Sequence, residues 1–137
     1  MKPAAVHYPL TVFYDASCPM CASEIQALKS RDAHDRLRLV DCSAAQFDDS
    51  VLAGLSIARG DLMTLLHVRD ARGRWFIGVE AFEQAYRAAG LETLAGWWGS
   101  RKLRPILSRL YPWIARHRQL LSRLGCNALV RLALPKR

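Results

Sequence analysis

The chain has 137 residues, of which 51% are hydrophobic and 23% are charged. This length and composition exclude a disordered protein and predict one folded domain with a hydrophobic core. No stretch has the roughly 18 uninterrupted apolar residues of a membrane span, and the N-terminus lacks a signal-peptide pattern. We therefore expect a cytoplasmic protein that is either soluble or attached to a membrane surface.

The net charge of +8 is unevenly distributed along the sequence. Residues 1–100 carry ten Lys or Arg and twelve Asp or Glu, whereas residues 101–137 carry ten Lys or Arg and no acidic residue. A mildly acidic body is thus followed by a strongly basic C-terminal region.

The first half of the chain alternates between strand-like and helix-like patterns. Short β-branched and aromatic runs predict strands, and apolar residues at three- and four-residue spacing predict helices. Ser17 is the expected N-cap of the first helix, and Pro19 suits its first turn. The predicted elements are a strand at 10–15, a helix at 18–32, a strand at 36–42 and a helix at 44–55.

The second half begins with a predicted hairpin. Two apolar runs within 63–78 flank the sequence DARG, whose Gly73 suits a turn with positive φ. An amphipathic helix is expected at 79–90, with Gly90 at its end. The pattern after it is helical, and Pro112 is expected to kink or split this last segment.

The element order β-α-β-α-β-β-α predicts an α/β fold. A right-handed βαβ unit followed by an antiparallel hairpin gives a four-stranded mixed sheet with helices on both faces, which is the thioredoxin-like arrangement. We expect a single domain over residues 1–137, with a core at about 8–90 and a basic helical extension at about 91–137.

The most informative motif is YDASCPMC at residues 14–21, where the first predicted strand meets the first predicted helix. The N-terminus of a helix stabilises a thiolate, so Cys18 is the expected nucleophile. Cys21, one turn further along, can resolve the mixed disulfide that Cys18 forms. Asp15 either helps to move a thiol proton or is an ordinary turn aspartate.

Two other interpretations of the cysteine pair are half of a zinc site and two inert thiols. Structural zinc needs four ligands, usually supplied by a second closely spaced pair. The other two cysteines are isolated and the four histidines are scattered, so the ligand spacing favours redox chemistry. Because a dithiol is itself the redox group, we expect no bound metal or organic cofactor.

The same motif resembles the opening of the DCC family of thiol-disulfide oxidoreductases, which is named for an aspartate and two cysteines in a DxxCxxC pattern. Here these residues are Asp15, Cys18 and Cys21. The stretches HVRDARGRWFIGVEAF and LYPWIARHR are similar to later parts of the family, so the resemblance covers roughly residues 10–120. It implies a thioredoxin-like fold and dithiol–disulfide exchange with a protein or a small-molecule thiol or disulfide.

One region departs from ordinary thioredoxins, which carry a cis-proline just before the third strand, facing the dithiol. This chain reads RGDLMTLLHV there, and Met63 or Thr64 is expected in place of the proline. Together with Pro19 and Met20, which lie between the two cysteines, these residues are the candidate substrate contacts.

The basic C-terminal region permits three interpretations. Arginines interleaved with Trp97, Trp98 and Trp113 are typical of a helix lying in a membrane surface, a contact that would involve residues 97–124. Nucleic-acid binding is the second, although no nucleic-acid motif accompanies the charge and we do not expect such a partner. The third, which we favour, is a helix that covers the core and has solvated arginines. A non-catalytic module that docks on a membrane or a partner protein is therefore the alternative to an enzyme.

Three further residues are expected to be structural, although their chemistry permits a role. Cys42 follows the second strand and is most simply a small buried residue. Cys126 is a helix-end residue in the basic region, and His67 is a partly buried histidine inside an apolar strand.

Overall fold

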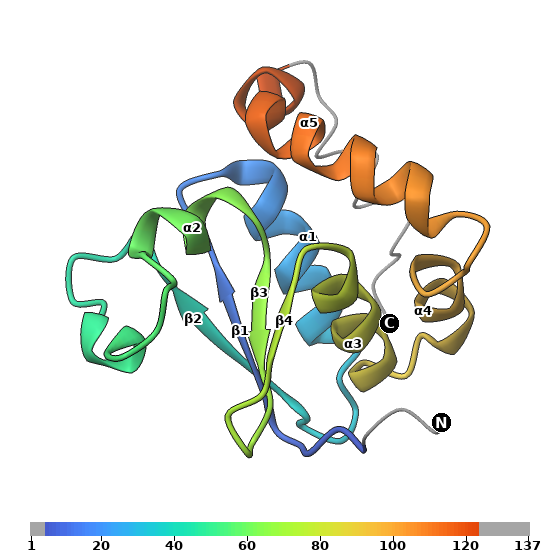
Figure 1. Ribbon diagram of the computed structural model, residues 1–137, viewed down its shortest axis with the longest axis horizontal. Helices are drawn as coiled ribbons and strands as arrows, with labels where there is room; N and C mark the ends of the chain where they lie inside the picture. Colours follow the sequence, from blue (N-terminus) through green and yellow to red (C-terminus); the bar gives the residue numbers. More distant parts are fainter. Residues whose placement is uncertain (1–4, 124–137) are drawn as a thin grey trace.

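The computed structural model describes residues 5–123. Its centre is a four-stranded sheet with the order β2-β1-β3-β4 (Figure 1). β1 is parallel to β2 and antiparallel to β3, and β3 is antiparallel to β4. The predicted α/β, thioredoxin-like fold with a mixed sheet is confirmed. The strands are β1 (Leu10–Tyr14), β2 (Leu37–Asp41), β3 (His67–Arg69) and β4 (Trp75–Ile77), and the helices are α1 (Pro19–Ser30), the 3-10 helix η1 (Asp49–Leu52), α2 (Arg59–Thr64), α3 (Val79–Ala88), α4 (Glu92–Trp98) and α5 (Arg104–Arg123).

One face of the sheet forms the main hydrophobic core with α1, α3 and α4. Val12 of β1 is paired with Leu39 of β2 and with Val68 of β3, and Val68 is paired with Phe76 of β4. Because side chains alternate along a strand, this row places four apolar groups on the same face. Helix side chains such as Phe82 of α3 pack on this face.

The opposite face of the sheet has a second, smaller cluster. Phe13 of β1 points to this side, and its ring stacks on Trp75 of β4 with a centroid distance of 5.1 Å. Leu52 of η1 and Leu62 of α2 pack against the same cluster, together with Cys42. Helices therefore cover both faces of the sheet, as predicted.

The helix predicted at 44–55 is wrong, because this segment holds turns and only the short η1. The carboxylate of Asp48 accepts the backbone N–H of Ser50 at 2.9 Å and caps η1. Asp and Ser side chains make such local hydrogen bonds in competition with longer helices, which explains why the apolar spacing alone was misleading.

The second α-helix of the fold is α2, which begins before the predicted hairpin segment and overlaps its start at Met63 and Thr64. Asp61 secures the start of this helix by accepting the backbone N–H of Ala58 at 2.8 Å. Met63 and Thr64 are consequently helical, and the strand begins only at His67. The rest of the hairpin prediction is confirmed, including Gly73 with a φ of +89° in the turn.

Two predictions about helices also need correction. The N-cap of α1 is Cys18, with extended backbone angles of φ −91° and ψ 112°, and not Ser17. Pro112 was expected to kink or split the last segment, and the split does not occur, because α5 continues through this residue as one helix. The end of α3 agrees with its prediction, since Gly90 follows it with a φ of +81°.

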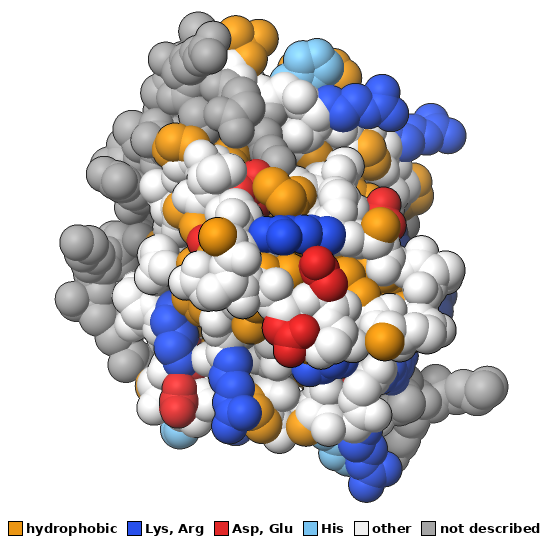
Figure 2. All heavy atoms as spheres, turned by 90° about the vertical axis from the view of Figure 1, so that its left-hand side faces the viewer, with side chains coloured by type: hydrophobic (Ala, Val, Ile, Leu, Met, Phe, Trp, Pro, Cys, Tyr) orange, Lys and Arg blue, Asp and Glu red, His pale blue; other side chains and the backbone are white. Residues whose placement is uncertain are grey.

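The C-terminal helices pack on the body of the domain. α4 packs against α3, and α5 crosses the ends of α1, α2 and α3 (Figure 1). In the part of the chain that the structure describes, no helix is long and apolar enough to cross a membrane. Figure 2 shows basic, acidic and hydrophobic side chains interspersed over one face of the molecule.

Candidate active site

The two cysteines of the motif lie at the start of α1 and have different environments. The Sγ atom of Cys18 accepts the backbone N–H of Cys21 at 3.5 Å, so this sulfur caps the helix. Cys18 has no exposed surface, whereas Cys21 is half-buried. Both are present as thiols. The structure thus places the Cys18 sulfur on the amides at the start of the helix, and it leaves Cys21 as the more accessible of the two.

Asp15 and Asp41 hold the loop that leads from β1 into α1. Asp15 is buried, and its carboxylate accepts the backbone N–H of Ser17 at 3.0 Å and also the Ser17 hydroxyl. Asp41, at the end of the neighbouring strand, accepts the backbone N–H of Ala16 at 3.1 Å. Hydrogen bonds to a carboxylate favour its charged form, and they keep the pKa of Asp41 below its usual value against the opposing effect of burial. Asp15 therefore makes the backbone contacts of an ordinary turn aspartate, which is one of the two roles considered for it from the sequence.

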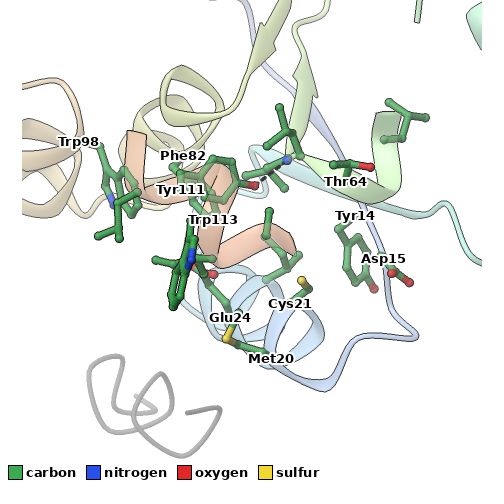
Figure 3. A pocket seen from close by; sticks show the side chains of 17 residues that line it. Tyr14, Asp15, Met20, Cys21, Glu24, Thr64, Phe82, Trp98, Tyr111 and Trp113 are labelled. Carbon is green, nitrogen blue, oxygen red and sulfur yellow. Dashed lines mark hydrogen bonds between the residues drawn. The ribbon is translucent and has the colours of Figure 1, made fainter. Parts of the chain in front are cut away.

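A cavity of about 490 Å³ opens beside Cys21, between α1 and α5 (Figure 3). Asp15, Met20, Cys21 and Thr64 line it, so four of the predicted site residues come together here. Pro19 and Met63 are not among the lining residues, and Met63 packs against the cluster on the opposite face of the sheet. The remaining lining is mainly apolar and comes from α1, α2, α3, α4, α5 and the segment before β3: Ile25, Leu62, Leu65, Leu66, Phe82, Trp98, Leu110, Tyr111, Trp113, Ile114 and Ala115, with Tyr14 and Glu24.

Glu24 is the most unusual polar residue of the cavity. It lies one turn beyond Cys21 on α1, and in Figure 3 it projects from this helix toward the same space as Cys21. The hydroxyl of Tyr86 donates a hydrogen bond to its Oε1 atom at 3.0 Å. Burial raises the pKa of Glu24 to about 7, and the hydrogen bond from Tyr86 only partly offsets this effect. Glu24 therefore changes its charge near neutral pH.

Tyr111 attaches α5 to the rest of the site. Its hydroxyl accepts the backbone N–H of Leu66 at 2.7 Å, just before β3. Its ring meets Phe82 edge to face at a centroid distance of 5.0 Å and lies against Gly78. The sequence alone did not single out Tyr111 or Glu24; the stretch LYPWIARHR, quoted for the family resemblance, was the available signal for Tyr111.

Cys42 and His67, whose side chains are reactive in other settings, are not among the residues that line the cavity. Cys42 is buried, and burial together with the nearby charge of Asp41 raises the pKa of its thiol to about 12. His67 is buried in β3, where Nδ1 lies 2.8 Å from the carbonyl oxygen of Leu65. Burial lowers the pKa of His67, which favours its neutral form. Cys126 lies outside the described residues.

The two neighbouring tryptophans of α4, Trp97 and Trp98, have different environments. Trp98 stacks on Phe82 with a centroid distance of 4.7 Å and lines the cavity, whereas Trp97 is 62% exposed.

Over residues 5–123, no three His, Cys, Asp or Glu side chains are grouped so that they could hold a metal ion.

The fold and the site define a thioredoxin-like protein with a CxxC pair at the start of its first helix. The chain belongs to the DCC1-like thiol-disulfide oxidoreductase family, whose model matches residues 12–124. A relative from Arabidopsis thaliana, named uncharacterized protein At5g50100, chloroplastic, is 29% identical over 97 residues. This match covers 70% of the chain and 42% of the relative, so the chain spans about two fifths of that relative's length. No solved structure matches the chain.

Proposed function

We propose that this protein is an oxidoreductase that exchanges thiols and disulfides through the pair Cys18 and Cys21. One observation carries the proposal: Cys18 caps α1 and Cys21 lies in its first turn, with the Cys18 sulfur 3.5 Å from the Cys21 amide, and Cys21 faces a cavity. The helix N-terminus stabilises a thiolate, and neighbouring cysteines in a CxxC motif can close a disulfide without a large movement of the backbone. Membership of the family supports the same chemistry.

The reaction needs one thiol to attack a substrate disulfide and the other to release the product. The sequence predicts that Cys18 attacks, that Cys21 resolves and that Asp15 helps to move a proton. Complete burial of Cys18 counts against an attack by this sulfur on a bulky partner. The hydrogen bonds that Asp15 accepts from Ser17 give this carboxylate a structural task in the loop.

The proposal is tested by following reduction of a peptide disulfide by the full-length protein. We expect the pre-reduced wild type to reduce about one disulfide per chain and to gain a bond between Cys18 and Cys21. Cys18→Ser and Cys21→Ser should each lose this complete reaction, whereas Cys42→Ser should retain it. Equal product yield from the double variant Cys18→Ser/Cys21→Ser would show that the pair is not the redox group.

A second candidate function is docking on an anionic membrane, which rests on the surface of α5. Ile106, Leu110 and Trp113 of this helix are 61%, 45% and 53% exposed. Exposed basic residues, including Arg109 and Arg116, lie on the same helix. Such an amphipathic surface suits the interface of an acidic bilayer.

Co-sedimentation with vesicles of phosphatidylserine and phosphatidylcholine tests this second function. Binding should fall in the full-length variant Arg109→Glu/Arg116→Glu and should weaken at high salt. A matched control is Arg72→Glu/Arg74→Glu, which changes the same charge in the hairpin turn at the other end of the sheet (Figure 1). Equal binding of both variants would refute a specific role of α5.

A further inference from the structure

The attacking thiol of a dithiol enzyme must be reachable by its substrate. Cys18 is completely buried, and it is not among the residues that line the cavity. Cys21 is half-buried and contributes directly to the cavity wall (Figure 3). Cys21 is therefore the accessible thiol and Cys18 is the thiol that caps the helix, although the sequence predicts that Cys18 has both properties.

The geometry points to Cys21 as the thiol that attacks the substrate, with the adjoining cavity as the binding site for an uncharged, apolar group next to the substrate sulfur. This inference rests on the proposed function and specifies its substrate class. Cys18 then takes the resolving role. Its sulfur already lies at the Cys21 backbone, so it approaches the mixed disulfide from inside the protein.

The residues that line the cavity indicate which class of substrate it can bind. Phe82, Trp98 and Trp113 supply aromatic surface from three different helices, and a volume of about 490 Å³ is sufficient for a large side chain. No Lys or Arg is among the described lining residues, and the carboxyl groups of the lining come from Asp15 and Glu24. A disulfide with an aromatic or aliphatic neighbour should therefore bind well, and one with a carboxylate neighbour should be repelled.

The reaction balances as a two-electron transfer. Cys21 loses its proton to solvent, and its thiolate attacks one sulfur of the substrate disulfide, so that the substrate S–S bond breaks and the leaving thiolate takes a proton. Cys18 loses its proton as its sulfur attacks the Cys21 sulfur of the mixed disulfide, and the second substrate thiolate that is released takes up a proton. The substrate disulfide is reduced to two thiols, and the protein dithiol is oxidised to a Cys18–Cys21 disulfide.

The order of attack is tested by trapping the mixed disulfide. Full-length Cys18→Ser and Cys21→Ser are each mixed with the symmetric disulfide of N-acetyl-Phe-Cys-amide, and adducts are located by peptide mapping. We expect Cys18→Ser to accumulate an adduct on Cys21 about tenfold faster than Cys21→Ser accumulates one on Cys18. If either variant fails to fold, limiting iodoacetamide on reduced wild type gives the same comparison. Faster modification of Cys18 by either method would overturn the assignment.

Substrate class is tested with the wild type and two tryptophan variants. The peptide disulfides contain Phe-Cys or Glu-Cys, so that the reacting cysteine is the same. We expect the wild type to prefer the Phe peptide about tenfold, Trp113→Ala to lose most of this preference, and Trp97→Ala to retain it. Trp97 is a matched control because, like Trp113, it is more than half exposed, but it does not line the cavity.

These outcomes test the proposed function and the substrate class separately. A wild type that reduces neither peptide and forms no Cys18–Cys21 bond would refute the proposed function itself. A wild type that forms this bond but shows no preference, or a Trp113→Ala variant with an unchanged preference, would overturn only the substrate class assigned to the cavity.

Discussion

Replacing Glu24 by Gln should remove a specific pH dependence from the stability of the fold. Burial raises the pKa of this carboxyl from 4.5 to about 7. An acid with a higher pKa in the folded state binds its proton more tightly there than in the unfolded state. The contribution of this proton to the free energy of unfolding is therefore complete below pH 4.5 and is lost as the pH rises through 7. At 1.36 kcal/mol per pKa unit, this loss corresponds to about 3 kcal/mol.

The Gln variant keeps a carbonyl oxygen that can accept the Tyr86 hydroxyl, but it has no proton to lose. Urea unfolding at pH 4.5 and pH 8 gives the free energy of unfolding of both proteins. We expect the variant to gain about 3 kcal/mol relative to the wild type between the two pH values. Other titrating groups such as His67 act on both proteins and cancel in this comparison. If the difference between variant and wild type is the same at both pH values, the pKa of Glu24 is not raised as the structure indicates.

Three further predictions concern Tyr111, Cys42 and Asp41. Tyr111→Phe removes the acceptor of the Leu66 N–H and leaves this buried donor without its side-chain partner, so the free energy of unfolding should fall by about 1–3 kcal/mol; an unchanged urea midpoint would contradict this. Cys42 should resist iodoacetamide at pH 8 in the folded protein, because its pKa is about 12, while Cys21 reacts; peptide mapping distinguishes them, and early labelling of Cys42 would contradict its burial. Asp41→Asn should loosen the loop at Ala16, and hydrogen exchange should show less protection of that amide than in wild type, whereas equal protection would exclude an anchoring role.

The sheet could be predicted from the sequence because its side-chain pattern is local. The run from Leu10 to Tyr14 is short, β-branched and aromatic, and the turn at Gly73 separates two apolar runs. Those signals lie within a few residues of each other and do not depend on distant partners.

The errors arose where local patterns were ambiguous. The apolar run from Leu62 to Leu66 is compatible with either a strand or a helix. The hydrogen bond from the Ala58 N–H to the Asp61 carboxylate, just before this run, favours the helix. At the other error, residues 44–55, the capping by Asp48 limits the helix to a short 3-10 turn.

The candidate site was predictable only in its first part. The positions of Cys18 and Cys21 at a helix start follow from the strand-to-helix pattern around them. Glu24 accepts its hydrogen bond from Tyr86, which is 62 residues away, and Tyr111 reaches Leu66 over 45 residues. No local pattern reports such contacts, so the cavity and its half-buried Glu24 could be found only from the folded structure.

The most direct test of the central claim is a redox titration of the full-length wild type in dithiothreitol buffers, with the disulfides mapped at each potential. The account predicts a reversible two-electron transition in which the bond between Cys18 and Cys21 forms and Cys42 stays a thiol. Thiols at both positions across the whole range of potentials, or a bond that joins either of them to Cys42 instead, would contradict it.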